Sequence, residues 1–141
     1  MPVVVCAAFI SWFSTDAFSA RSTHNYIDPV LRLLFGDLSP AGMRLAHAVV
    51  RKLAHLTEYA LLGSLLCRAL AEPGAQLRLA LLARVLLYCG LYASADELHQ
   101  TFVMSRTGSP VDVGIDVAGA GIGALLFVWR RGRALRASPG G

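Results

Sequence analysis

The stretch "ADELHQTFVMSRTGSPVDVGIDVAG", residues 95–119, decides the fold. It lies between two long apolar segments and carries six ionisable side chains: Asp96, Glu97, His99, Arg106, Asp112 and Asp116. Charged side chains are costly in hydrocarbon, so those in membrane helices usually face the bundle interior and pair with one another. The stretch therefore predicts the end of one membrane-spanning helix, a short connection and the start of the next helix.

The composition of the whole chain is typical of a membrane protein. Its 141 residues are 55% hydrophobic and 16% charged, whereas about a quarter of the residues of an average soluble domain are charged. A chain of this length forms one domain at most. We predict a single all-α, polytopic membrane domain over residues 1–141, a small bundle of about four transmembrane helices with a polar cluster near one membrane face.

Four apolar segments outline the expected spans, at residues 3–13, 53–71, 79–96 and 111–129. The last three are close to the roughly 20 residues that a helix needs to cross the hydrocarbon layer. The first is too short to cross it alone, so it extends to residue 18, is partly re-entrant, or has its true start upstream.

Residues 14–44 are predicted to form an extramembrane or interfacial connection. Within it, "PVLRLLF" (29–35) is a candidate amphipathic helix lying at the interface. Ser39 is a candidate N-cap for the following helix, with Pro40 at the first helical position.

Polar residues of three spans are predicted to lie at one depth. Successive spans alternate in direction, so the start of the second, the end of the third and the start of the fourth lie on the same side of the membrane. Helical periodicity places polar residues on one face of each span. The three faces contain, in chain order, Lys52, His55 and Tyr59, with Glu58 beside them; then Asp96, His99 and Gln100; then Asp112, Asp116, Gly119 and Gly123. We expect these faces to meet, because each would otherwise contact lipid.

Gly119 and Gly123 are one turn apart and follow the two aspartates on the same face. Small residues at this spacing let a second helix approach closely. We expect an intramolecular contact rather than a dimer interface, because the chain has neighbouring spans of its own.

Basic residues indicate the orientation. The tail at 130–141 contains Arg130, Arg131, Arg133 and Arg136, and Arg68 and Arg78 flank the "EPGAQ" loop. Cytoplasmic ends of membrane helices are enriched in such residues, so we expect a cytoplasmic C-terminus and a polar cluster at the outer face of the cytoplasmic membrane. The opposing signal is a second basic set on the predicted outer side: Arg21, Arg32, Arg44, Arg51 and Lys52. The lipid bilayer is the expected partner, and nucleic acid is not.

Neither a metal site nor a cofactor is assigned from the sequence. Cys6, Cys67 and Cys89 are single cysteines in apolar segments and are expected to be buried thiols. The spacing of His55 and Glu58 is found in metal-binding helical bundles. The HExxH motif is absent, however, and no complete ligand set can be identified.

Two motifs resemble those of the VanZ-like family: "RKLAHLTEYALLG" (51–63) and "DELHQTFVMSRTGSPVDVGIDVAGAGIG" (96–123). The family pattern is K-x-x-H-x-x-E-Y, then D-E-x-H-Q, an R-T-G/A segment and D-x-x-x-D-x-x-G. It falls on Lys52, His55, Glu58, Tyr59, Asp96, Glu97, His99, Gln100, Arg106, Thr107, Asp112, Asp116 and Gly119. One departure is "VMSR" (103–106), where a proline and a glycine usually precede the arginine.

The resemblance covers roughly residues 45–129 and implies a small multi-helix membrane protein. The family is named for a protein that raises resistance to the glycopeptide antibiotic teicoplanin. A link to glycopeptide resistance is therefore an expectation for this chain, and the family supplies no agreed catalytic roles.

Three interpretations of the polar residues stay open. In the first, a non-enzymatic outer pocket binds an anionic lipid or glycan headgroup through Lys52 and Arg106. The side chains that would orient these cations are Glu58, Asp96, Asp112 and Asp116.

In the second interpretation, the chain is an enzyme. The pairs His55 with Glu58 and Glu97 with His99 would then act in acid/base catalysis or bind a metal ion. In the third, the ion pairs only fix the register of the helices, to which polar contacts add little energy. The sequence does not decide between them.

Overall fold

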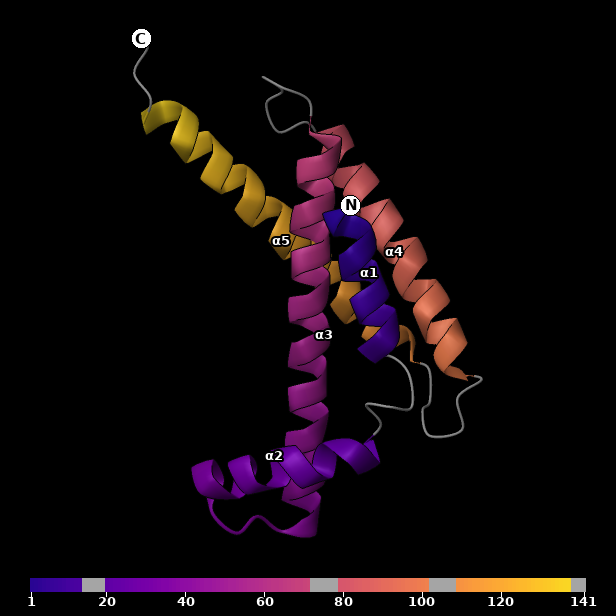
Figure 1. The fold of residues 1–141 in the computed structure, drawn as a ribbon, viewed down its shortest axis with the longest axis vertical. Coiled ribbons are helices and arrows are strands. Elements are labelled where there is room, and N and C mark those ends of the chain that lie inside the picture. Colours follow the sequence, from indigo (N-terminus) through magenta and orange to yellow (C-terminus); the bar gives the residue numbers. More distant parts are fainter. Residues whose placement is uncertain (14–19, 72–78, 102–108, 138–141) are drawn as a thin grey trace.

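The computed structural model describes residues 1–13, 20–71, 79–101 and 109–137. These residues form α-helices and no strand: α1 (Pro2–Phe13), α2 (Ala20–Phe35), α3 (Pro40–Leu70), α4 (Leu79–Thr101) and α5 (Pro110–Ala137). Figure 1 shows α1, α3, α4 and α5 gathered into a bundle, whereas α2 lies across the lower part of α3. The prediction of an all-α fold is confirmed.

Two of the described helices are long and apolar enough to cross a membrane, namely α4 and residues 110–134 of α5. α1 is also apolar, but its 12 residues extend only about 18 Å, well short of a hydrocarbon layer of about 30 Å. α3 is long, but Arg44, Arg51 and Lys52 interrupt its first half. The structure thus supports two of the roughly four predicted spans.

α3 is the central helix. It begins as predicted, because the Ser39 side chain accepts a hydrogen bond from the backbone N–H of Gly42 at 3.2 Å and Pro40 occupies the first turn. Its 31 residues extend about 46 Å. The second half contacts α1, α4 and α5, and the first half projects beyond them to α2 (Figure 1).

α3 and α5 cross at very short range. A Cβ atom added to Gly119 or Gly123 would overlap the backbone of Leu56 or Ala60, and one added to Gly63 would overlap the backbone of Ala120. These contacts require glycine because the two backbones leave no room for a side chain. The contacts are intramolecular, as the sequence predicted for Gly119 and Gly123. Gly63, on the facing helix, was not singled out.

The core lies where the four bundled helices meet. Its fully buried members range from Tyr59, the largest, to small residues such as Ala93 and Ala120, and include Val85. The three cysteines are buried and free, as predicted. Large apolar side chains of α4 and α5 point outward instead, among them Leu87, Leu91, Leu125 and Leu126. An apolar exterior of this extent is typical of a surface that contacts lipid.

α2 differs from the predicted short helix at 29–35. It begins at Ala20 and continues through Pro29. The predicted helix began at this proline, which removes one intrahelical hydrogen bond and is best tolerated in the first turn. The helix is nonetheless held to α3 by an ion pair between Asp28 and His47, at 2.5 Å.

Candidate functional site

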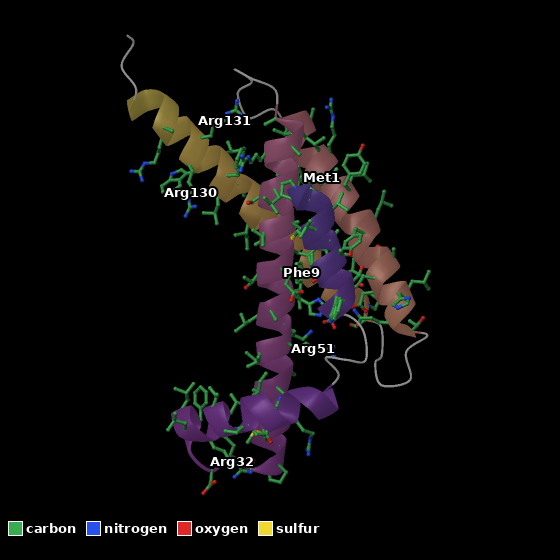
Figure 2. All side chains as sticks on the ribbon, in the orientation of Figure 1. Met1, Phe9, Arg32, Arg51, Arg130 and Arg131 are labelled. Atoms are coloured by element: carbon green, nitrogen blue, oxygen red, sulfur yellow. The ribbon has the colours of Figure 1, made fainter. Side chains whose placement is uncertain are left out.

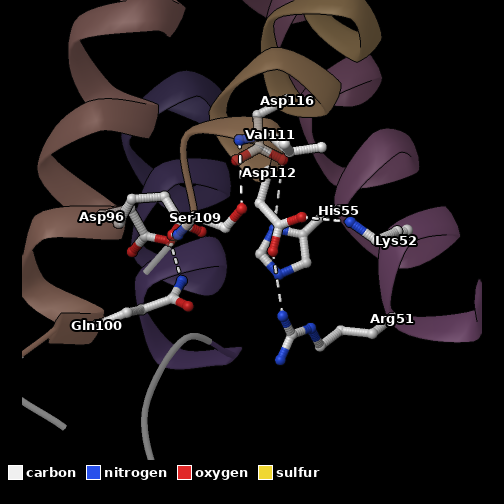
Figure 3. A network of polar contacts seen from close by, with 10 residues as sticks. Arg51, Lys52, His55, Asp96, Gln100, Ser109, Val111, Asp112 and Asp116 are labelled. Carbon is white, nitrogen blue, oxygen red and sulfur yellow. Dashed lines mark hydrogen bonds and ion pairs between the residues drawn. The ribbon is translucent and has the colours of Figure 1, made fainter. Parts of the chain in front are cut away.

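Polar side chains from three helices meet at one end of the bundle (Figure 3). They come from the middle of α3, the last turns of α4 and the first turns of α5, the three regions that alternating spans place at one depth. We call this group the polar cluster. Its described members are Arg51, Lys52, His55, Tyr59, Asp96, Glu97, Gln100, Ser109, Asp112 and Asp116.

Asp112 joins the first turn of α5 to α3. One carboxylate oxygen accepts a hydrogen bond from Lys52 Nζ at 2.5 Å, and the other accepts one from Arg51 Nη2 at 3.1 Å (Figure 3). The Asp112 side chain is only 9% exposed, whereas those of Arg51 and Lys52 are 46% and 41% exposed. A nearly buried carboxylate therefore holds two cations at the surface of the cluster.

One turn further along α5, Asp116 faces His55. The distance between Asp116 Oδ1 and His55 Nδ1 is 3.3 Å, and the two side chains are 1% and 13% exposed. The hydroxyl of Tyr59, one turn along α3, is also fully buried. Within the described part of the chain, neither this hydroxyl nor the Asp116 oxygens have a hydrogen-bond partner. Unsatisfied buried groups of this kind are rare and costly, and they often mark functional positions.

The end of α4 contributes three buried polar side chains. Gln100 Nε2 donates to Asp96 Oδ2 at 3.0 Å within the helix. Glu97 Oε2 accepts the backbone N–H of Ser109 at 2.6 Å, and the Ser109 hydroxyl accepts the N–H of Val111 at 3.3 Å (Figure 3). Glu97 thereby fixes the start of α5 against the end of α4.

Comparison with known families identifies the architecture. The sequence profile of the family described as VanZ/LLP1 matches residues 2–131. The chain belongs to the VanZ/LLP1 family. No curated protein and no solved structure matches it. The family match reaches well beyond the motif region at 45–129 and takes in α1 and α2. Together with the two apolar helices, it indicates a membrane protein.

The grouping of polar residues on α4 differs from the prediction. The sequence grouped Asp96, His99 and Gln100, but His99 is exposed and Glu97 is buried in its place. At about 100° per residue, Gln100 and Glu97 lie to one side of Asp96, and His99 lies to the other side. The face that turns toward α3 and α5 is therefore centred near Gln100.

In the structure of this VanZ-family chain, His55 and Glu97 contact partners outside their own helices. His55 faces Asp116 on α5, which the predicted pair of His55 with Glu58 did not include. Glu97 accepts a backbone N–H instead of pairing with His99. The predicted pairs joined neighbours along one helix, whereas these contacts join different segments of the bundle. The reason is that the bundle brings buried groups of different helices face to face.

The other predicted site residues have varied positions. Glu58 is half-buried on α3, and Arg106 and Thr107 lie outside the described residues. Arg51 was not predicted, although its position directly before Lys52 was a usable signal. Over residues 1–13, 20–71, 79–101 and 109–137, no group of three or more His, Cys, Asp or Glu side chains is arranged to hold a metal ion.

Proposed function

We propose that this VanZ-family protein binds the anionic headgroup of an envelope lipid or lipid-linked glycan at the polar cluster. The observation that carries the proposal is the arrangement of Arg51 and Lys52 on Asp112. Both cations are fixed in position by a nearly buried carboxylate and are still partly open to a ligand.

The chemistry of the two cations suits phosphate. A lysine ammonium has three N–H donors and a guanidinium has five, and Asp112 accepts one from each. Among the residues that the structure describes, the remaining donors have no other partner and can bind a ligand. Guanidinium groups bind phosphate oxygens in a bidentate manner. Because Asp112 orients both side chains in advance, less conformational entropy is lost when a headgroup binds.

We place the polar cluster at the outer face of the cytoplasmic membrane, in a multi-pass chain with a cytoplasmic C-terminus. Arg130, Arg131 and Arg133 follow the apolar part of α5 at the opposite end of the bundle. The guanidinium of Arg133 lies 4.6 Å from the ring centre of Trp129. Arginine at the end of a span is typical of the cytoplasmic side, and tryptophan is typical of a membrane interface on either side.

The test is lipid binding by the full chain. The wild type, the double variant Arg51→Gln/Lys52→Gln and the control Arg130→Gln are each reconstituted in nanodiscs. Native mass spectrometry then measures how much phosphatidylglycerol each protein retains. We expect about tenfold weaker retention for the double variant, since a hydrogen bond to a charged group contributes about 1.5–3 kcal/mol and 1.4 kcal/mol is tenfold. Equal retention by the double variant and the control would exclude the cluster as the headgroup site.

The same variants address glycopeptide resistance, which we propose as a cellular consequence of headgroup binding. Expression of the wild type in a susceptible host would raise the inhibitory concentration of teicoplanin, and the double variant at equal membrane abundance would not. If the double variant still confers resistance, then resistance does not depend on headgroup binding at the polar cluster.

A second candidate function, an acid/base enzyme, is favoured by the contact between His55 and Asp116. A buried carboxylate close to an imidazole is a recurrent arrangement in general-base catalysis, and the almost fully buried Asp116 lies 3.3 Å from His55. Asp116→Asn separates the candidates. Loss of phenotype with unchanged lipid retention favours the enzyme, and unchanged phenotype counts against it.

A further inference from the structure

We propose that α2 lies in the headgroup layer of the membrane, on the same side as the polar cluster, with its apolar face on the acyl chains. The partner is the lipid bilayer itself. The inference depends on the membrane helices of the chain and is independent of the proposed headgroup site.

The C-terminal half of α2 is amphipathic. At about 100° per residue, Val30, Leu33 and Leu34 lie within about 100° of arc, and Arg32 lies on the opposite side. The three apolar side chains are 52%, 85% and 67% exposed. By contrast, Leu31, at right angles to this face, is buried. A small helix with such an exposed apolar face and a charged opposite face is typical of interfacial helices.

The depth of α2 matches the headgroup layer. His47, which pairs with Asp28 of α2, precedes Lys52 by five residues, or about 7.5 Å along the axis of α3. The polar cluster lies at the end of the apolar helices α4 and α5. The headgroup layer is roughly 5–8 Å thick on each side of the hydrocarbon core. The contact of α2 with α3, about 7.5 Å beyond Lys52, therefore falls at the depth of this layer.

The apolar face points in the direction that a bilayer requires. α2 lies across α3, so it is parallel to the membrane plane if α3 follows the other bundled helices (Figure 1). In Figure 2, Arg32 lies at the lower edge of α2, on the side away from α1, α4 and α5. Val30 and Leu34 lie opposite to Arg32 on the helix, and Leu33 lies beside them. This apolar face is therefore turned toward the hydrocarbon side.

α3 continues this apolar surface toward the bundle. Leu45, Val49 and Leu53 follow one another at intervals of four residues and are all exposed. They form a stripe between α2 and the lipid-facing surface of the membrane helices. Arg32 and Arg44 are exposed near the same end, and basic residues of interfacial helices favour anionic headgroups. This continuity and charge favour a lipid surface over a second protein copy.

The experiment measures the depth of two neighbouring positions in the full chain, reconstituted in vesicles of phosphatidylcholine and phosphatidylglycerol. A fluorophore sensitive to polarity is attached to Leu33→Cys or, as the matched control on the charged side of the helix about 100° away, to Arg32→Cys. The native cysteines are buried. We expect blue-shifted emission and severalfold stronger quenching by brominated lipid at position 33, with quenching by aqueous iodide dominant at position 32.

Equal iodide quenching at both positions would overturn the proposal, because α2 would then lie in water. Shielding of position 33 that disappears when the protein is diluted into excess lipid would also overturn it, since a second copy would then cover the face. Both side chains are exposed, so neither substitution removes a core contact.

Discussion

Lys52 of α3 and Asp112 of α5 are 60 residues apart in the sequence, and their side chains meet at 2.5 Å. Arg51 shares the same carboxylate. The contact ties the two helices together at the level where α3 leaves the bundle and continues toward α2 (Figure 1). It is thus both an anchor of the α3–α5 pair and the feature that fixes the two cations of the proposed headgroup site.

Asp112→Asn should destabilise the protein moderately. Removal of one partner from a buried ion pair costs several kcal/mol, but the two cations here are partly exposed and solvent screens them. We therefore expect a loss of about 1–2 kcal/mol, below the full buried-pair cost. Thermal unfolding in detergent measures it. The control is Asp37→Asn, whose ion pair with Arg32 is fully at the surface and should contribute almost nothing.

Gly123→Ala should separate α3 from α5. The added methyl group would overlap the backbone of Ala60, so at least one helix must shift, at a cost of about 1–3 kcal/mol or more. Gly114→Ala is the matched control on the same helix, because a Cβ atom there meets nothing within 4 Å. Because alanine has a higher helix propensity than glycine, Gly114→Ala should even stabilise α5 by up to about 1 kcal/mol. Similar melting temperatures for the two variants would contradict the close crossing.

Glu97→Ala should loosen the start of α5, because the Ser109 N–H would lose its acceptor. Glu97→Gln keeps an oxygen in the same place and should behave closer to the wild type. Hydrogen exchange of the amides of Asp112 and Val113, which bond to the Ser109 carbonyl, reports this directly. Equal protection in both variants would show that the α4–α5 contact does not depend on this bond.

The sequence predicted the depth of the polar residues better than their partners. Depth follows from the alternation of spans alone, and this is why Lys52, His55, Asp96 and Asp112 were expected at one level and meet there. Partners depend on which way each helix faces, and this is set by packing against neighbours that the sequence does not show. This is why the sequence assigned His99 rather than Glu97 to the buried face of α4 and did not predict the contact of His55 with Asp116.

The same limit applies to the small residues and to α2. Gly119 and Gly123 could be recognised because their spacing repeats on one helix, but Gly63 is alone on the facing helix and has no such pattern. The extension of α2 through Pro29 was missed, because local rules for proline do not account for the contacts with α3 that hold the helix.

The two histidines of the motif region should behave differently. His99→Ala removes an exposed side chain and should change the unfolding free energy by less than about 0.5 kcal/mol. His55→Ala leaves the buried Asp116 carboxylate without the imidazole that faces it and should be clearly destabilising. The free energies of unfolding of the two variants in detergent test the ranking. A larger loss for His99→Ala would mean that the buried face of α4 is centred elsewhere.

The proposed orientation can be tested with single cysteines at the two ends of the bundle. Thr101→Cys lies at the polar end and Ala134→Cys at the arginine-rich end, and both positions are exposed. The native cysteines are buried and should react slowly. If basic residues mark the cytoplasmic side, an impermeant maleimide should label Thr101→Cys on intact cells and Ala134→Cys only after permeabilisation. The opposite pattern would place the polar cluster in the cytoplasm, and the headgroup ligand would then have to come from the inner leaflet.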